Sequence, residues 1–427
     1  MTKELIVLLS DREIGRVRQD QRGKLKFTYD EAWRETRGAY PLSLSMPLAA
    51  SEHAHAAIDA FIWGLLPDNE FVLGKWAQKF QVSARNAFAL ISNVGEDCAG
   101  AVQFVRPDRL EEVKAQGPGS VEWIDEKEIA ARLKALRADH SAWRAPRDTG
   151  QFSLAGAQPK TALLYQNGKW GVPSGRMPTT HILKPPTGAF DGHAENEHFC
   201  LSLARTLGLP TASSSIMRFD DEVAIVVERY DRRVTDRGVI RIHQEDMCQA
   251  LGLPPTMKYE NEGGPGVSSI VELLREYSGA AKEDVSTFID AIAFNWLIAG
   301  TDAHTKNYSV LIGAGGRARL APFYDIASAL PYDEFDPMKL KLAMKLGGEY
   351  RLRNITARKW EKLAEEVRLD ADALMSRVVE ITKALPDAVT VISKELTACG
   401  LDHSILKKMK EKIISRANDE IRLIRPS

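Results

Sequence analysis

The strongest constraint on the fold is a change of pattern along the chain at about residue 240. From 151 to 240, short apolar segments alternate with Gly, Asn and Pro, which is typical of β-strands joined by turns. A single helix, over 194–208, is expected to interrupt them. The segments that we interpret as strands are FSLAG (152–156), TALLY (161–165), KWGVP (169–173), HILKPP (181–186) and EVAIVVERYDRR (222–233).

Beyond residue 240 the apolar residues recur at helical spacing, and strands become rare. A β-rich half followed by a helical half predicts an α+β fold with two lobes, and a cleft between lobes is a favoured ligand site. The helices that we expect in the second half span 243–252, 267–277, 283–299, 357–366, 371–384 and 402–424.

The first 150 residues have a pattern of their own. Three apolar segments within 3–30 predict short strands, 54–100 reads as helical, and DEKEIAARLKALRAD (125–139) predicts a charged helix before a connector with Pro and Arg. At ~100–200 residues per domain, a chain of 427 residues should hold two or three domains. We therefore expect an N-terminal subdomain (1–150), a β-rich N-lobe (151–240) and a helical C-lobe (241–427).

Composition excludes several classes of protein. The net charge is −1, so no overall field favours nucleic acid or an anionic membrane, and a DNA contact would need a local patch or a partner. The cysteines lie far apart without CxxC spacing, which argues against a zinc ribbon or a disulfide framework. Neither a signal peptide nor a membrane span of ~18 apolar residues is evident. We expect a cytoplasmic enzyme or regulator. The cysteines are Cys98, Cys200, Cys248 and Cys399.

The polar stretch GTDAHTKNYSV (300–310) lies between two apolar segments. Asp302 and Asn307 have the spacing of a protein-kinase catalytic loop, in which the Asp accepts a proton and the Asn binds magnesium. A Gly-rich hairpin follows and leads to Asp325, where kinases carry their second magnesium ligand. Each residue alone would more often be a turn or helix-end residue, but the ordered set favours catalysis. We expect His304 to pack in the loop or to contact ATP and not to bind a metal, because no second His or Cys lies at ligand spacing.

Other parts of a kinase site are expected upstream. Lys184 ends a predicted strand and could hold phosphates, and Glu197, or else Glu195, lies on the next predicted helix to orient that lysine. The strand that ends in Glu228, Arg229 and Tyr230 leads into a linker suited to an adenine edge. The small residues of SLAGAQPK (153–160) would let backbone N–H groups approach phosphates. Neither GxxxxGK[ST] nor GxGxxG is present, so this is not a Walker loop, a Rossmann turn or an ordinary kinase glycine loop.

On these residues the chain resembles the HipA family, the serine/threonine kinase toxins of hipBA toxin–antitoxin modules. The resemblance implies a bilobed kinase-like fold, Mg²⁺ and ATP as cofactors, and phosphorylation of a protein serine. It further implies that the phosphorylated protein is an aminoacyl-tRNA synthetase, as it is for members of the family. It also implies a HipB-like helix-turn-helix antitoxin through which operator DNA is mainly bound. The motifs that carry it are PLSLSMPL, GLLPDN, FSLAGAQPKTALL, PTTHILKPP, ERYDRR, QEDMCQALGLP, KYENEGGPG, TDAHTKNYSV, PFYDIASALP and KLAMKLGG.

The resemblance assigns roles residue by residue. Asp302 is similar to the proton acceptor, Asn307 and Asp325 to the magnesium ligands, Lys184 to the phosphate-binding lysine, and Ser153 to an autophosphorylated serine. Pro159 stands where the resemblance leads us to expect Glu, which would change the stiffness of the loop. The nucleotide-binding residues implied are Ala155, Gly156, Ala157, Gln158, Pro159, Lys160, Lys184, Glu228, Arg229, Tyr230, His304, Asn307, Tyr324 and Asp325.

Two other functions remain open from the residues alone. A small-molecule phosphotransferase can use the same Asp, Asn and Asp, and a non-catalytic co-repressor could keep the fold and reach operator DNA through its antitoxin. The serine-bearing SLAGAQPK loop favours the toxin kinase over the first, and the full set of chemical groups favours it over the second. The basic segment KKMKEKIISR (407–416) is more often a solvated helix face than a contact with antitoxin or DNA.

Overall fold

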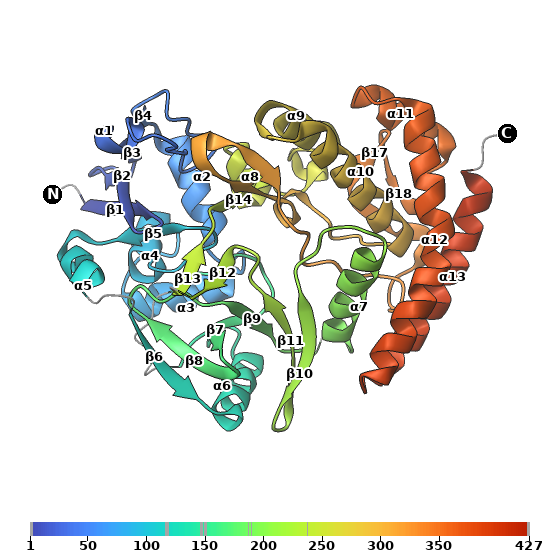
Figure 1. Cartoon of the computed structure of the whole chain (residues 1–427), viewed down its shortest axis with the longest axis horizontal. Coiled ribbons are helices and arrows are strands. Elements are labelled where there is room, and N and C mark those ends of the chain that lie inside the picture. The colour runs from blue at the N-terminus through green and yellow to red at the C-terminus, as the bar shows by residue number, and fades with distance from the viewer. Residues whose placement is uncertain are drawn as a thin grey trace. The chain divides into compact units, whose positions relative to one another are not determined.

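The computed structural model describes residues 3–115, 119–145, 148, 152–186, 188, 190–236 and 238–424. The chain forms two compact units (Figure 1). The first comprises Met1–Pro185, Met217–Thr256 and Ser309–Ala318, and the second Pro186–Ile216, Met257–Tyr308 and Arg319–Ser427. The domain boundary expected between residues 150 and 151 lies outside the described residues.

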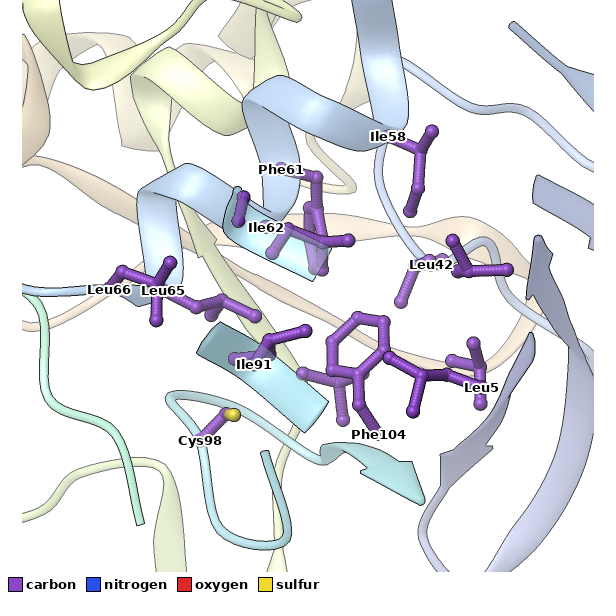
Figure 2. Packing of buried hydrophobic residues seen from close by; sticks show 14 of the residues in the cluster. Leu5, Leu42, Ile58, Phe61, Ile62, Leu65, Leu66, Ile91, Cys98 and Phe104 are labelled. Atoms are coloured by element: carbon purple, nitrogen blue, oxygen red, sulfur yellow. The ribbon is translucent and has the colours of Figure 1, made fainter. Parts of the chain in front are cut away.

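The first unit begins with an antiparallel sheet in the order β4-β3-β2-β1-β5. Strands β1, β2 and β3 confirm those predicted within 3–30. Figure 2 shows side chains from β1, β5, α2 and α4 meeting in one apolar core, among them Leu5, Phe61, Ile91 and Phe104. The elements are β1 (Lys3–Leu9), β2 (Arg12–Gln19), β3 (Leu25–Tyr29), α1 (Glu31–Arg34), β4 (Glu52–His53), α2 (His55–Leu65), α3 (Glu70–Phe80), α4 (Ala87–Val94), β5 (Val102–Val105) and α5 (Leu110–Ala115).

A second sheet has the order β10-β11-β9-β7-β8-β6 and packs on helix α6, whose Ile129 and Leu133 are buried in its core. The expected strand at 152–156 is wrong. Phe152 and Gly156 make only isolated bridges, to Asp97 and Pro67, and Gly156 takes a left-handed φ of 100° that breaks strand geometry. The elements are β6 (Ser120–Ile124), α6 (Glu126–Ala138), β7 (Thr161–Gln166), β8 (Lys169–Ser174), β9 (His181–Lys184), β10 (Ser214–Phe219) and β11 (Glu222–Glu228).

Two smaller sheets follow, a hairpin of two strands and a three-stranded sheet in the order β14-β15-β16. The hairpin of β12 (Arg232–Thr235) and β13 (Gly238–Arg241) follows β11, and β14 (Gln244–Asp246) pairs with β15 (Ser309–Ile312). The helix expected at 243–252 is therefore wrong in its first half. Long-range pairing with β15 holds β14 extended, and only α8 (Met247–Ala250) is helical, with a capping box between Asp246 and Gln249.

The second unit is mainly helical, as predicted. Helix α12 differs from the expectation, because it runs past Pro386 to Ala398 instead of ending at 384. Its buried face continues through Val389 and Ile392, and this packing outweighs the hydrogen bond that a proline removes. The hairpin β17–β18 was not predicted. The elements are α7 (His193–Thr206), α9 (Val267–Tyr277), α10 (Ala281–Ile298), β16 (Ala318–Leu320, at the unit boundary), β17 (Lys341–Leu346), β18 (Glu349–Arg351), α11 (Ala357–Glu366), α12 (Ala371–Ala398) and α13 (Ser404–Leu423).

None of the helices in the described ranges combines the length and the apolar character that a membrane crossing requires.

A tight turn at the end of α10 sets the position of the polar 300–310 segment. Ala299 adopts a left-handed φ of 53°, and the Gly300 amide then donates to the Asn295 carbonyl at 2.7 Å. A Cβ on Gly300 would lie 2.2 Å from the buried Asn295 Oδ1. That amide is held in turn, because its Nδ2 donates to the Ala291 carbonyl at 3.0 Å and to the Tyr308 hydroxyl at 3.3 Å. The turn therefore needs glycine.

We expect Gly300→Ala to lower the free energy of unfolding by ~1–3 kcal/mol, the usual cost of overpacking a well-packed site. Urea unfolding followed by circular dichroism measures it. Gly313→Ala is the matched control, because its Cβ would lie 3.8 Å from the Arg317 carbonyl oxygen in ordinary contact. Equal midpoints for the two variants would contradict the steric argument.

Candidate active site

The 300–308 loop is built around the backbone carbonyl of Asp302. That oxygen accepts the His304 amide at 2.8 Å and the Asn307 Nδ2 at 3.0 Å. A short 3₁₀ turn, Thr305–Asn307, follows and leads directly into β15. The Asp302 carboxylate is exposed, whereas Asn307 is buried. The loop thus presents an acid to solvent from a backbone that is fixed by its own hydrogen bonds.

Asp325 lies against the same loop. The Asn307 Nδ2 also contacts the Asp325 carbonyl, at 3.5 Å, and the Tyr324 hydroxyl donates to the Lys306 carbonyl at 2.8 Å. Asp325 has a φ of 57°, a left-handed conformation that is uncommon outside glycine and costs backbone free energy. Backbone strain of this kind gathers at functional sites.

The Asn307 amide has a defined orientation. Both of its neighbours are carbonyl acceptors, so its NH₂ group must face them and its Oδ1 is turned away as a possible oxygen ligand. With the Asp325 carboxylate it gives two oxygen donors on adjoining segments. Among the described residues no group of three or more His, Cys, Asp or Glu could hold a metal. Such a sparse oxygen set does not suit zinc but suits magnesium, which keeps waters and substrate phosphates in its shell.

The His304 ring is buried. Burial lowers its pKa, the Asp302 carboxylate opposes this, and the Lys258 ammonium lowers the pKa further. The ring packs edge to face on Tyr259, with centroids 5.0 Å apart. These contacts agree with a packing role within the loop.

The predicted phosphate-side residues lie in the first unit. Lys184 ends β9 and is buried. In the 155–160 loop, the Lys160 Nζ donates to the Ala155 carbonyl at 2.7 Å, and the Asp68 amide donates to the Gly156 carbonyl at 3.2 Å. The loop borders a small pocket of about 30 Å³, whose lining residues are Pro67, Asn69, Val72, Trp76, His140, Trp143, Leu154 and 156–160.

Ser153 precedes that loop and is fully buried. Its hydroxyl donates to the Leu65 carbonyl at 2.7 Å, and its amide donates to the Asp97 carbonyl at 3.0 Å. The hydroxyl is therefore an internal tie between the loop and the end of α2 in this structure.

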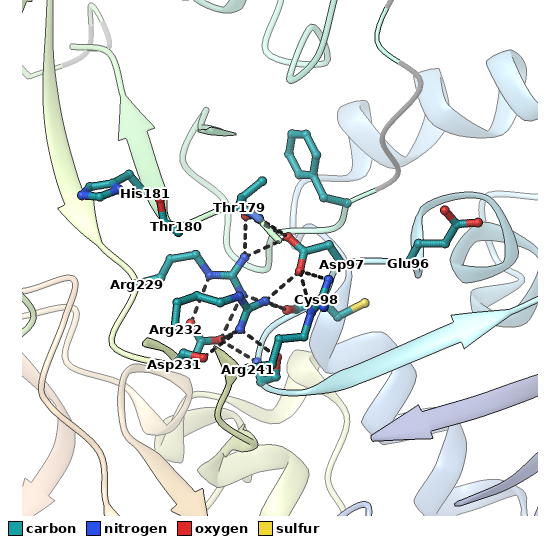
Figure 3. Close-up of polar contacts among 12 residues, drawn as sticks. Glu96, Asp97, Cys98, Thr179, Thr180, His181, Arg229, Asp231, Arg232 and Arg241 are labelled. Atoms are coloured by element: carbon teal, nitrogen blue, oxygen red, sulfur yellow. Dashed lines mark hydrogen bonds and ion pairs between the residues drawn. The ribbon is translucent and has the colours of Figure 1, made fainter. Parts of the chain in front are cut away.

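The predicted adenine linker has a second task that the sequence did not indicate. Glu228 ends β11 and is exposed, whereas the Arg229 side chain is buried in a network of aspartates and other arginines (Figure 3). Its guanidinium donates to Asp231 at 2.9 Å and to the Thr179 hydroxyl at 2.8 Å. The Tyr230 hydroxyl contacts the Gln244 side chain. The Arg229 side chain is therefore held within this network, and its backbone amide also donates within the protein, to the Thr180 carbonyl at 2.9 Å.

Asp97 is the centre of that buried network. Its carboxylate pairs with Arg232 at 2.8 Å, Arg241 at 3.3 Å and Arg229 at 3.5 Å, and it accepts the Thr179 amide at 3.0 Å. Burial opposes its ionisation, but the guanidinium groups outweigh burial and hold its pKa below the usual range. The ERYDRR motif was the only sequence signal for this network, since Asp97 itself stands in no evident motif.

The second unit thus brings the predicted catalytic-loop residues into direct contact. Asp302, Asn307 and Asp325 share hydrogen bonds through the Asn307 amide, and His304 and Tyr324 belong to the same cluster. Glu195 and Glu197 are both buried on α7. Lys184 belongs to the first unit, so its pairing with Glu197 stays a prediction.

Comparison with known proteins identifies the family. Residues 5–105 match the HipA N-terminal domain, and 152–389 match the HipA-like C-terminal domain. The chain belongs to the HipA family. It is 36% identical over 410 residues to the protein Y4mE of Sinorhizobium fredii, covering 95% of this chain and 96% of that one. It is 30% identical over 418 residues to the serine/threonine-protein kinase toxin HipA of Shewanella oneidensis, covering 92% of each chain.

The fold agrees with this membership. The HipA chain in the Shewanella oneidensis complex of HipA, HipB and operator DNA matches with a TM-score of 0.84 and 26% identity, over 98% of each chain. The predicted α+β kinase-like fold and the predicted activity class are therefore confirmed: the chain is a HipA-type serine/threonine kinase. The individual roles of the site residues stay predictions.

Proposed function

We propose that this kinase is a toxin that transfers the γ-phosphoryl group of ATP to a serine of a cellular protein and thereby halts translation and growth. By resemblance the acceptor protein is an aminoacyl-tRNA synthetase. The observation that carries the proposal is that the Asn307 Nδ2 donates to the backbone carbonyls of both Asp302 and Asp325. The proposed proton acceptor and the two proposed magnesium ligands therefore belong to one hydrogen-bonded cluster.

In the proposed reaction the acceptor serine oxygen attacks the γ-phosphorus, and the bond between that phosphorus and the β–γ bridging oxygen breaks. The serine proton passes to the exposed Asp302 carboxylate, and ADP leaves with the electron pair. Asn307 Oδ1 and the Asp325 carboxylate would hold Mg²⁺, which neutralises phosphate charge in phosphoryl transfer. The backbone bonds of the 300–308 loop keep these groups in place before substrate arrives, so little reorganisation is needed.

The residues of the first unit would hold the nucleotide. Lys184 supplies a cation for the phosphates, and 155–160 supplies backbone N–H groups around Gly156. Glu228, Arg229 and Tyr230 would form the linker beside the adenine edge, in which the Arg229 amide is already bonded to the Thr180 carbonyl at 2.9 Å. The Arg229 side chain, fixed by Asp231 at 2.9 Å, would hold that linker rigid.

Ser153 is proposed as an autophosphorylation site that switches the enzyme off. A phosphoryl group adds about −1.5 to −2 charges and three acceptor oxygens. The fully buried hydroxyl, bonded to Leu65, has no room for such a group, so modification requires the 153–160 segment to leave its present position. A displaced segment would no longer cradle ATP phosphates, which makes the modified enzyme inactive.

A HipB-like helix-turn-helix antitoxin is the proposed partner, and operator DNA the proposed indirect ligand. The structural relative is found with HipB and its operator DNA. The net charge of −1 supports DNA binding mainly through that partner. We place the enzyme in the cytoplasm, where its translation targets are.

Phosphopeptide mass spectrometry tests the proposal. We expect cells that express the chain to gain a phosphoserine on a translation protein and on Ser153, whereas cells that express Asp302→Asn gain neither. The purified kinase should then label the same protein with ATP in vitro. Transfer only to a small metabolite, with no protein phosphopeptide above the Asp302→Asn background, would replace the toxin by a small-molecule phosphotransferase.

A further inference from the structure

A second segment braces the catalytic loop. Residues 257–266, which contain the KYENEGGPG motif, run beside the 300–308 loop within the second unit. The Thr305 amide donates to the Lys258 carbonyl at 3.2 Å, and the buried Thr305 hydroxyl donates to the Pro265 carbonyl at 3.0 Å. Both ends of the 257–266 segment are therefore tied to one residue of the loop.

The 257–266 segment is itself tightly built. The Gly264 amide donates to the Tyr259 carbonyl at 3.0 Å, and a Cβ on Gly264 would lie 2.0 Å from the Met257 carbonyl oxygen. Glu260 anchors the segment to β17, because its carboxylate accepts the Lys345 amide at 2.5 Å. A Cβ on Gly266 would meet that carboxylate at 2.9 Å. Glycines thus allow close approaches that fix the position of Tyr259.

Tyr259 connects this segment to the proton acceptor. Its hydroxyl donates to the Asp302 Oδ1 at 2.7 Å, and its ring packs edge to face on His304. A hydrogen bond to an ionised acceptor is stronger than a neutral one. A carboxylate accepts through two oxygens, so one is fixed by Tyr259 and the other can face an acceptor hydroxyl. An exposed Asp side chain without such a partner would sample several rotamers.

We propose that Tyr259 is a positioning residue, whose hydroxyl holds the Asp302 carboxylate in the rotamer that receives the substrate proton. The inference rests on the proposed role of Asp302 as proton acceptor. It gives the KYENEGGPG motif a task in catalysis: the motif builds a rigid support that aims one hydroxyl at the base.

Steady-state kinetics of Tyr259→Phe in the full chain test this inference. The substitution removes the hydroxyl and keeps the ring on His304. We expect kcat to fall ~10-fold, the scale of one hydrogen bond to a charged group, while KM for ATP changes less than ~2-fold. A merely structural role would lower the melting temperature and leave kcat per folded molecule unchanged. Tyr350→Phe is the matched control: this half-buried tyrosine of the same unit carries Lys345 on its ring, 5.3 Å from the centroid, and should keep the parental kcat.

A double variant separates the proposed role of Tyr259 from the proposed role of Asp302 as the base. If Tyr259 acts through Asp302, adding Tyr259→Phe to Asp302→Asn should change the residual single-turnover rate by less than ~2-fold, because the positioned group is already gone. A rate for Tyr259→Phe equal to or above the parental rate, with Asp302→Asn inactive, would overturn the inference alone; a faster variant would mean that Tyr259 blocks the base. Full activity of Asp302→Asn would instead overturn the assignment of the base, and the inference with it.

Discussion

Replacing Asp302 by Asn should leave the fold intact and lower phosphotransfer by ~10²–10⁴-fold, the range that general-base assistance supplies. The side chain is exposed, so no buried charge or cavity is created. The backbone carbonyl that organises His304 and Asn307 is unchanged by the substitution. An amide oxygen can still accept the Tyr259 hydroxyl. What is lost is the group that takes a proton.

The measurement is protein phosphorylation by purified variants, together with growth inhibition in cells. Asp333→Asn is the matched control. Asp333 is an exposed acid of the same unit, and hydrogen bonds from Lys412 and Lys408 lower its pKa to about 2. The same change of charge there should leave the rate within ~2-fold, as expected of a surface substitution away from the site. A variant of Asp302 that keeps most of the parental rate would move the proton-accepting role elsewhere.

Local periodicity predicted the helices whose amphipathic pattern begins and ends at clear signals. The expected ranges 267–277 and 357–366 agree with α9 and α11 because one face of each is apolar throughout and turn residues flank both. Expectation failed where distant contacts decide. Pairing with β15 keeps β14 extended, and packing carries α12 past Pro386. Neither the pairing of β14 with β15 nor the packing around α12 can be predicted from a short stretch of sequence.

In the candidate site, too, local sequence predicted some residues and distant contacts determined others. The spacing of Asp302 and Asn307 and the hairpin before Asp325 predicted three residues that the structure joins through one amide. Tyr259 was missed as a site residue, since only the folded chain carries its hydroxyl to Asp302. The residues expected at the adenine linker were predicted from strand pattern, which cannot reveal that the Arg229 side chain serves a buried network.

That network should determine the stability of the first unit. Asp97→Ala is expected to lower the free energy of unfolding by ~3–5 kcal/mol, the cost of removing one partner from a buried ion pair. Asp97 is buried and faces Arg229, Arg232 and Arg241. Among the described residues one other acid, Asp231, pairs with two of them, Arg229 and Arg232. Without Asp97, Arg229 and Arg232 would share the Asp231 carboxylate, and Arg241 would lose the carboxylate that it faces, in a site closed to water.

Urea unfolding of the full chain at neutral pH measures the effect of Asp97→Ala, with Asp108→Ala as the control. Asp108 is an exposed acid that pairs with the exposed Arg106 at 3.1 Å, and its loss should cost at most ~1 kcal/mol. Since the folded-state pKa of Asp97 is lowered, its stabilisation is full above the unfolded-state pKa of ~3.9 and is lost as pH falls toward the folded-state value. The difference between parent and Asp97→Ala should therefore be constant from about pH 7 to 5 and shrink below about pH 4. A difference that stays constant on acidification, or an Asp97→Ala midpoint equal to that of Asp108→Ala, would mean that the three arginines do not depend on Asp97.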